Sequence, residues 1–117
     1  MSQHIQVGRS GEDIAAAYLE QLGYDIVERN WRCHAGEVDI IARDRSHIVV
    51  VEVKTRSSLL YGHPFEALTP AKIARLYRLA VLWCVEHRWR GRFRVDAISV
   101  LLDRNAPPTI EHLEEVQ

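Results

Sequence analysis

The chain has 117 residues, of which 47% are hydrophobic and 26% charged, and its formal net charge is −1. These proportions are typical of one folded domain over residues 1–117 and exclude a second one, and no apolar run reaches the roughly 18 residues of a membrane-spanning helix. The first five residues lack the basic and then apolar layout of a signal peptide, so we expect a cytoplasmic protein with no membrane partner.

The first predicted element is a helix that begins at Ser10. Asp13, three positions later, resembles the second half of a capping box, and apolar residues recur at helical spacing until Gly23 ends the helix. Residues 24–31 alternate loosely between apolar and charged side chains. This alternation predicts a strand near the edge of a sheet.

Two β-branched runs, over residues 37–43 and 47–54, flank the turn residues Asp44, Arg45 and Ser46. The simplest interpretation is a β-hairpin. The second run is apolar almost throughout, so we expect it to be a central strand that is covered on both faces.

The remaining elements follow a loop over residues 55–68, which is long enough to suggest a functional role. Thr69 is predicted to cap a long helix with Pro70 at its first position, and residues 94–102 predict another strand. We assign no element to residues 105–117. The order α-β-β-β-α-β predicts an α/β fold with a mixed sheet flanked by helices, and its core spans about residues 8–103.

The hairpin would bring two carboxylates together. Whether its turn holds two or four residues, the numbers of paired residues sum to 91, so Asp39 lies opposite Glu52. Two facing carboxylates repel each other, and a divalent cation such as Mg²⁺ would offset this repulsion. Lys54 lies on the same face as Glu52, where its ammonium group could orient a water molecule or stabilise charge on a phosphate.

These residues also match a known signature. The stretch Gly36-Glu37-Val38-Asp39-Ile40-Ile41-Ala42, with Glu52-Val53-Lys54 thirteen residues after Asp39, resembles the PD-(D/E)xK nuclease superfamily, with Val38 in the place of the proline. The element order is similar to that of archaeal Holliday-junction resolvases. A more extensive resemblance is to the YraN-like family of bacterial proteins, and it is carried by Gly11-Glu12, Ala16-Ala17-Tyr18-Leu19, Gly23-Tyr24, Arg29-Asn30-Trp31-Arg32, residues 36–42, Val51-Glu52-Val53-Lys54-Thr55-Arg56, Lys72 and Arg94-Val95-Asp96.

The resemblance implies a restriction-endonuclease-like fold and metal-assisted hydrolysis of a phosphodiester. Asp39, Glu52 and the backbone carbonyl of Val53 would hold Mg²⁺ or Mn²⁺, as one or two ions, and Lys54 would assist. Glu12 matches a helix glutamate that joins the site in the resolvases. Simpler alternatives remain open, because Glu12 also suits the first turn of a helix and Glu52 could simply pair with Lys54.

The uneven charge of the chain suggests the partner. Residues 54–94 hold nine basic and two acidic residues (net +7), whereas residues 1–53 and 95–117 each have a net charge of −4. Either these blocks pair with one another on a solvated surface, or Arg56, Lys72 and Arg75 contact phosphates. We expect a nucleic-acid partner, DNA in particular, and a homodimer as in resolvases is left open. The alternative function is a non-catalytic nucleic-acid or protein binding module that retains the nuclease fold.

Overall fold

The computed structural model describes residues 3–58 and 62–117. Two helices, α1 (Gln3–Gln21) and α2 (Pro70–Glu86), accompany a five-stranded sheet, and a short 3-10 helix, η1 (Pro64–Ala67), precedes α2. The strands are β1 (Asp25–Cys33), β2 (Gly36–Arg43), β3 (His47–Arg56), β4 (Arg92–Asp103) and β5 (Ala106–Leu113). The predicted α/β order is therefore present, with one further strand at its end.

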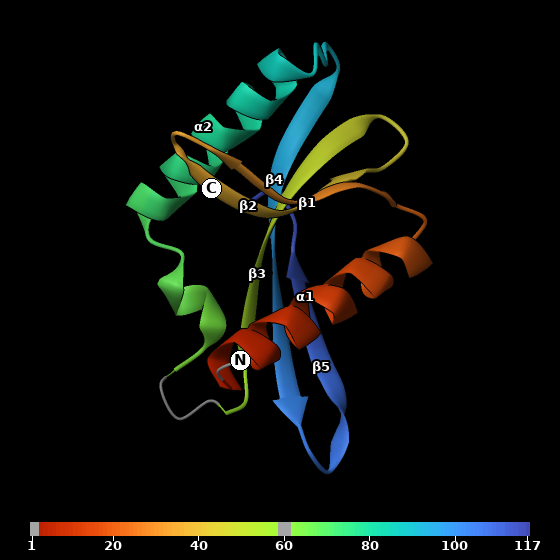
Figure 1. The fold of residues 1–117 in the computed structure, drawn as a ribbon, viewed down its shortest axis with the longest axis vertical. Coiled ribbons are helices and arrows are strands. Elements are labelled where there is room, and N and C mark those ends of the chain that lie inside the picture. The colour runs from red at the N-terminus through yellow and green to blue at the C-terminus, as the bar shows by residue number, and fades with distance from the viewer. Residues whose placement is uncertain (1–2, 59–61) are drawn as a thin grey trace.

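The sheet has the order β1-β2-β3-β4-β5, so β3 is its central strand and β1 lies at one edge, as predicted (Figure 1). Strands β3 and β4 are parallel, and the other three pairs are antiparallel. A parallel pair needs a crossover connection, which α2 supplies between β3 and β4. The fold is a mixed α/β sheet consistent with a restriction-endonuclease-like core.

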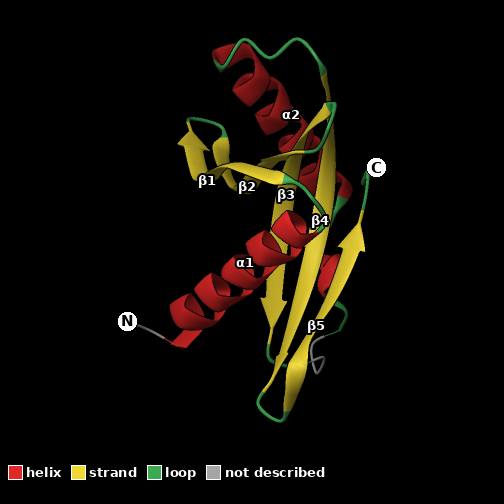
Figure 2. Cartoon of the chain, turned by 90° about the vertical axis from the view of Figure 1, so that its right-hand side faces the viewer, coloured by secondary structure: helices red, strands yellow, loops and turns green. Residues whose placement is uncertain are grey.

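Each helix buries one face of the sheet, and the two helices lie on opposite sides of it (Figure 2). One core cluster, on the α1 face, includes Leu19, Val51 and Ile98. The other lies under α2 and includes Leu76, Trp83 and further apolar residues of β3 and β4. The apolar run of β3 is thus explained by contact with a helix on both sides.

Helix α1 begins at Gln3 rather than at the predicted Ser10. The prediction was wrong at this end because Ser10 and Gly11 usually mark a helix boundary, whereas here Gly11 is needed inside the helix. Gly11 is buried, and a Cβ added to it would overlap the side chain of Thr55 on β3. The close approach of the two backbones therefore outweighs the poor helix propensity of glycine.

The other helix follows its prediction. Thr69 caps α2, and its side-chain oxygen accepts a hydrogen bond of 3.1 Å from the backbone N–H of Lys72. The loop predicted over residues 55–68 is shorter, because β3 continues to Arg56 and η1 occupies its end. Its residues 59–61 lie outside the described residues.

Strand β5 lies in the segment to which the sequence assigned no element. It contains Pro107 and Pro108, which lack a backbone N–H and are tolerated in a sheet only at an edge. β5 pairs with β4 alone, so it can accommodate both prolines. Beyond it, Val116 is buried, where its N–H donates to the carbonyl of Val95 and its own carbonyl accepts from the hydroxyl of Tyr77.

Candidate metal centre

The β2–β3 hairpin has the register that the sequence predicted. Its pairs run from Arg43 opposite Ile48 to Ile40 opposite Val51, and all of them sum to 91. Asp39 and Glu52 occupy the next position along the hairpin. There the carboxylate of Asp39 accepts a hydrogen bond of 2.8 Å from the backbone N–H of Val53.

The surroundings of Asp39 favour its protonated form. Burial, the negative charge of Glu52 and a hydrogen bond between the two carboxyl groups raise the pKa of Asp39 to about 7, although the N–H of Val53 opposes this shift. Near neutral pH the two side chains therefore form a close, partly protonated pair. Such a pair binds a cation well, because a cation can take the place of the shared proton.

Two lysines stand beside these carboxyl groups. Glu52, Lys54 and Lys72 line the same small pocket on the α2 face of the sheet, together with residues of η1. Lys72 Nζ lies 3.6 Å from Glu52 Oε1. Burial and the positive charges of Arg56 and Lys72 lower the pKa of Lys54, although Glu52 and Asp39 partly offset them. The charged form of Lys54 is therefore less favoured than that of an isolated lysine, because the two carboxyl groups do not fully offset its burial and its two positive neighbours.

Glu12 lies near this group but is held by other residues. Its Oε1 accepts a hydrogen bond of 3.1 Å from Arg29, which also pairs with Asp13 at 2.6 Å. Its side chain is only 13% exposed, and burial raises its pKa, with a smaller contribution from the charge of Asp39. Within residues 3–58 and 62–117, Glu12, Asp39 and Glu52 do not form a group with three ligand atoms mutually within 4.8 Å.

The predicted phosphate contacts have different surroundings. Lys72 is half-buried at the pocket, whereas Arg75 is exposed on α2. The Nε atom of Arg56 is buried and has no hydrogen-bond partner in the described part of the chain.

A second group of potential ligands was not foreseen. Ligand atoms of Asp96, His112 and Glu114 lie within 4.8 Å of one another, so this group could hold a metal ion. His112 Nε2 lies 2.8 Å from Asp96, whose side chain is fully buried. The sequence singled out Asp96 only within a family motif, and it gave no signal for His112 because β5 was not predicted.

Arg94 already neutralises much of this second group. It contacts both carboxylate oxygens of Asp96, at 3.0 and 3.1 Å, and lies 3.0 Å from Asp44. Burial alone would raise the pKa of Asp96, but hydrogen bonds from His112 and Arg94 lower it below its ordinary value. A metal ion would have to compete with this guanidinium group, whereas Asp39 has no arginine partner among the described residues.

None of the helices in the described ranges is long and apolar enough to cross a membrane. Residues 11–100 match a family described as the uncharacterised protein family UPF0102. A UPF0102 protein of Arthrobacter sp. is 55% identical over 111 residues, which cover 94% of both chains. A UPF0102 protein of Renibacterium salmoninarum is 48% identical over 97% of both chains. Another, from Streptomyces griseus, is 46% identical over 94% of both chains.

These names state no activity, substrate or partner. The matches do cover almost the whole chain at about half identity, and they include the stretches of sequence around Asp39 and Glu52 that carry the predicted site. The chain therefore belongs to UPF0102, the YraN-like family that its motifs indicated.

Proposed function

We propose that the protein is a metal-dependent nuclease that hydrolyses phosphodiester bonds in structured nucleic acid, with DNA as the expected substrate in repair or recombination. The observation that carries this proposal is the close carboxyl pair of Asp39 and Glu52, with Lys54 beside it. Two facing acids cost stability unless a cation or proton offsets them. A fold that keeps this arrangement beside a pocket is suited to hold a cation there.

The donor set fits Mg²⁺ or Mn²⁺. Asp39 and Glu52 provide the anionic oxygens that such hard cations prefer, and the Val53 carbonyl would supply a neutral one. When bound, the ion would lower the pKa of a water molecule and stabilise the charge that develops on the phosphate. The N–H of Val53 holds the Asp39 carboxylate in a fixed orientation before any ion arrives.

The remaining roles follow from charge and position. Lys72 neutralises Glu52 in this structure and would be released toward a phosphate once a cation binds Glu52. Lys54 would stabilise negative charge on the phosphate or orient the attacking water. Glu12 would position water or a second ion, for which it must leave Arg29.

Arg56, Lys72 and Arg75 would hold the nucleic acid through its phosphates. Such contacts fix the orientation of a duplex or junction without reading its sequence. The buried Nε of Arg56, for which the described residues supply no acceptor, supports this assignment, because a buried donor without an acceptor is costly and a phosphate oxygen would satisfy it.

The test is cleavage of labelled duplexes, flaps, four-way junctions and single strands in the presence of Mg²⁺ or Mn²⁺. Asp39→Asn and Glu52→Gln should each lower the rate by at least about a hundredfold, as expected for loss of a metal ligand or its support. The matched control is Glu20→Gln, because Glu20 is an exposed acid of α1 and should not affect the rate.

Activity that survives both site substitutions would refute the assignment of Asp39 and Glu52. A different result would favour the alternative function: no cleavage of any substrate, together with binding that Arg56→Ala and Lys72→Ala weaken. In that case the protein is a non-catalytic binding module that retains the nuclease fold.

A further inference from the structure

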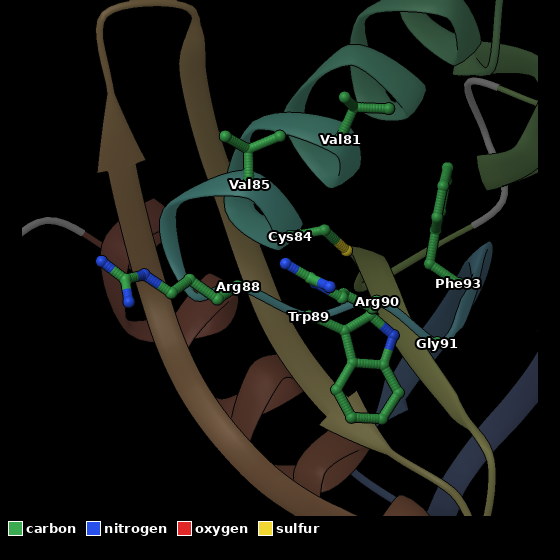
Figure 3. A pocket seen from close by; sticks show the side chains of 8 residues that line it. All are labelled: Val81, Cys84, Val85, Arg88, Trp89, Arg90, Gly91 and Phe93. Atoms are coloured by element: carbon green, nitrogen blue, oxygen red, sulfur yellow. The ribbon is translucent and has the colours of Figure 1, made fainter.

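A groove lies at the C-terminal end of α2, at the opposite end of this helix from Lys72. The last turns of α2, the turn that follows and the start of β4 surround it (Figure 3). We call it the arginine-rimmed groove, and it is lined by Val81, Cys84, Val85, Arg88, Trp89, Arg90, Gly91 and Phe93. None of these residues belongs to the proposed nuclease site.

Several of the side chains that line this groove are apolar. Val81 is 46% exposed and Val85 is 70% exposed, although both belong to a helix that otherwise buries its apolar face. Trp89 and Phe93 are half-buried and pack against the core under α2. The groove therefore presents aliphatic and aromatic surface that has no cover in this structure.

The rim of the groove is positively charged. Arg88 and Arg90 are exposed, and within the described ranges neither has a carboxylate within ion-pair distance. Arg43 adds a third positive charge, because its guanidinium group lies 4.8 Å from the centre of the Trp89 ring. Uncompensated arginines next to apolar surface favour a ligand that is both acidic and apolar.

The turn that carries these arginines is held in place by local hydrogen bonds. The N–H of Trp89 donates to the carbonyl of Cys84 at 2.8 Å, and the N–H of Arg88 donates to the carbonyl of Val85 at 3.2 Å. These two hydrogen bonds form the Schellman pattern of a helix end. The indole N–H of Trp89 donates to the carbonyl of Arg92 at 2.9 Å. Gly91 leaves room for this ring, because an added Cβ would lie 2.7 Å from it. The groove is therefore preorganised.

Arg88 occupies the position of the Schellman pattern that usually holds glycine. Its φ of +54° lies in the left-handed region, which costs free energy for a residue with a side chain. An arginine at this position raises the positive charge of the rim at the expense of local stability. Residues that keep such a strained conformation are frequent at binding sites.

From these features we infer that the arginine-rimmed groove docks an acidic and apolar segment of a partner protein. The apolar side chains of this segment would cover Val81 and Val85, while its carboxylates pair with Arg88 and Arg90. A nucleic acid would satisfy the arginines but offers much less aliphatic surface to the exposed valines than apolar side chains do, because its aliphatic groups are limited to the sugar and the thymine methyl. The aromatic and arginine content of the groove is also typical of surfaces where a few residues dominate protein binding.

The test uses the full chain and a phage-displayed library of short random peptides. The enriched peptides should combine aspartate or glutamate with large apolar residues. The most enriched peptide is then labelled, and its dissociation constant is measured by fluorescence anisotropy. Val85→Ser and Arg90→Ser should each weaken its binding about tenfold or more, and added salt should weaken it further.

Matched controls are Val27→Ser, at an exposed valine of β1, and Arg104→Ser, at an exposed arginine of the β4–β5 turn, and neither should change the affinity. Circular dichroism checks that all four variants are folded.

No enrichment of acidic and apolar peptides would overturn the inference. It would also be overturned if Val85→Ser and Arg90→Ser bound the peptide as tightly as the wild-type protein. It would also fail if a DNA duplex displaced the peptide from wild type and bound Val85→Ser unchanged. Self-association that depends on Val85 would identify a second copy of this chain as the occupant instead.

Discussion

Asp39→Asn should stabilise the protein at neutral and higher pH while removing its response to Mg²⁺. Asp39 has a pKa of about 7 in the folded protein and 3.8 as its ordinary value. Between these values the unfolded chain has lost this proton while the folded chain keeps it, so the free energy of unfolding falls as pH rises from about 4 to about 7. The two pKa values differ by roughly three units, which corresponds to about 4 kcal/mol. Above pH 7, ionised Asp39 lowers the free energy of unfolding by this amount.

An asparagine avoids this cost because it carries no charge, and its side-chain oxygen can still accept the hydrogen bond from Val53. Urea unfolding at about pH 5 and about pH 8, without metal, should therefore show a larger gain for Asp39→Asn at the higher pH, where the whole cost is present, than at the lower pH, where less than half of it is. Added Mg²⁺ should raise the melting temperature of the wild-type protein at the higher pH, and a chelator should reverse this rise. Asp39→Asn should show neither effect.

Glu20→Gln is the control for a lost negative charge, because Glu20 is exposed on α1. It should leave both the pH dependence and the Mg²⁺ response as in the wild type. If Asp39→Asn and the wild-type protein lose stability in parallel between these pH values, Asp39 is not protonated in the folded state and the tight carboxyl pair does not exist.

Three further substitutions test the packing. Gly11→Ala should destabilise the protein by about 1–3 kcal/mol in urea unfolding, because the added methyl group overlaps Thr55, and Thr55→Gly in the same chain should restore much of the loss. Arg88→Gly should raise stability by up to about 1 kcal/mol, since glycine adopts the left-handed conformation without strain; an unchanged melting temperature would contradict this. Asp96→Ala should cost about 3–5 kcal/mol by leaving Arg94 without its buried partner, and a mild effect would show that Arg94 reaches other acceptors.

The register of the hairpin that carries the candidate site was predictable, because local sequence determines its geometry. The register of the β2–β3 hairpin follows from its turn, whose Asp44 side chain accepts hydrogen bonds from the N–H groups of Ser46 and His47. Because side chains alternate along a strand, this register places Asp39 opposite Glu52 without any knowledge of the rest of the fold. The same holds for α2, whose start is marked by the neighbouring residues Thr69, which caps it, and Pro70, at its first position.

Features that depend on distant parts of the chain were not predictable. The helical conformation of Gly11 depends on β3, more than forty positions away, and the prolines of β5 exclude a strand unless its place at the sheet edge is known. The pairing of Asp96 with His112 requires that same strand. Local propensity carries no information on such contacts, so the sequence indicated neither the second ligand group nor the groove.

The basic block of residues 54–94 also has a different meaning in three dimensions. Lys54, Arg56 and Lys72 gather where β3 ends and α2 begins, whereas Arg88 and Arg90 surround the groove at the other end of α2. One stretch of sequence therefore supplies two separate positive regions, because a helix of 17 residues stands between them. The first lies beside acidic groups suited to a cation and a phosphate, and the second lies beside apolar surface suited to a protein. A near-neutral chain can in this way present two distinct positively charged surfaces without a high net charge.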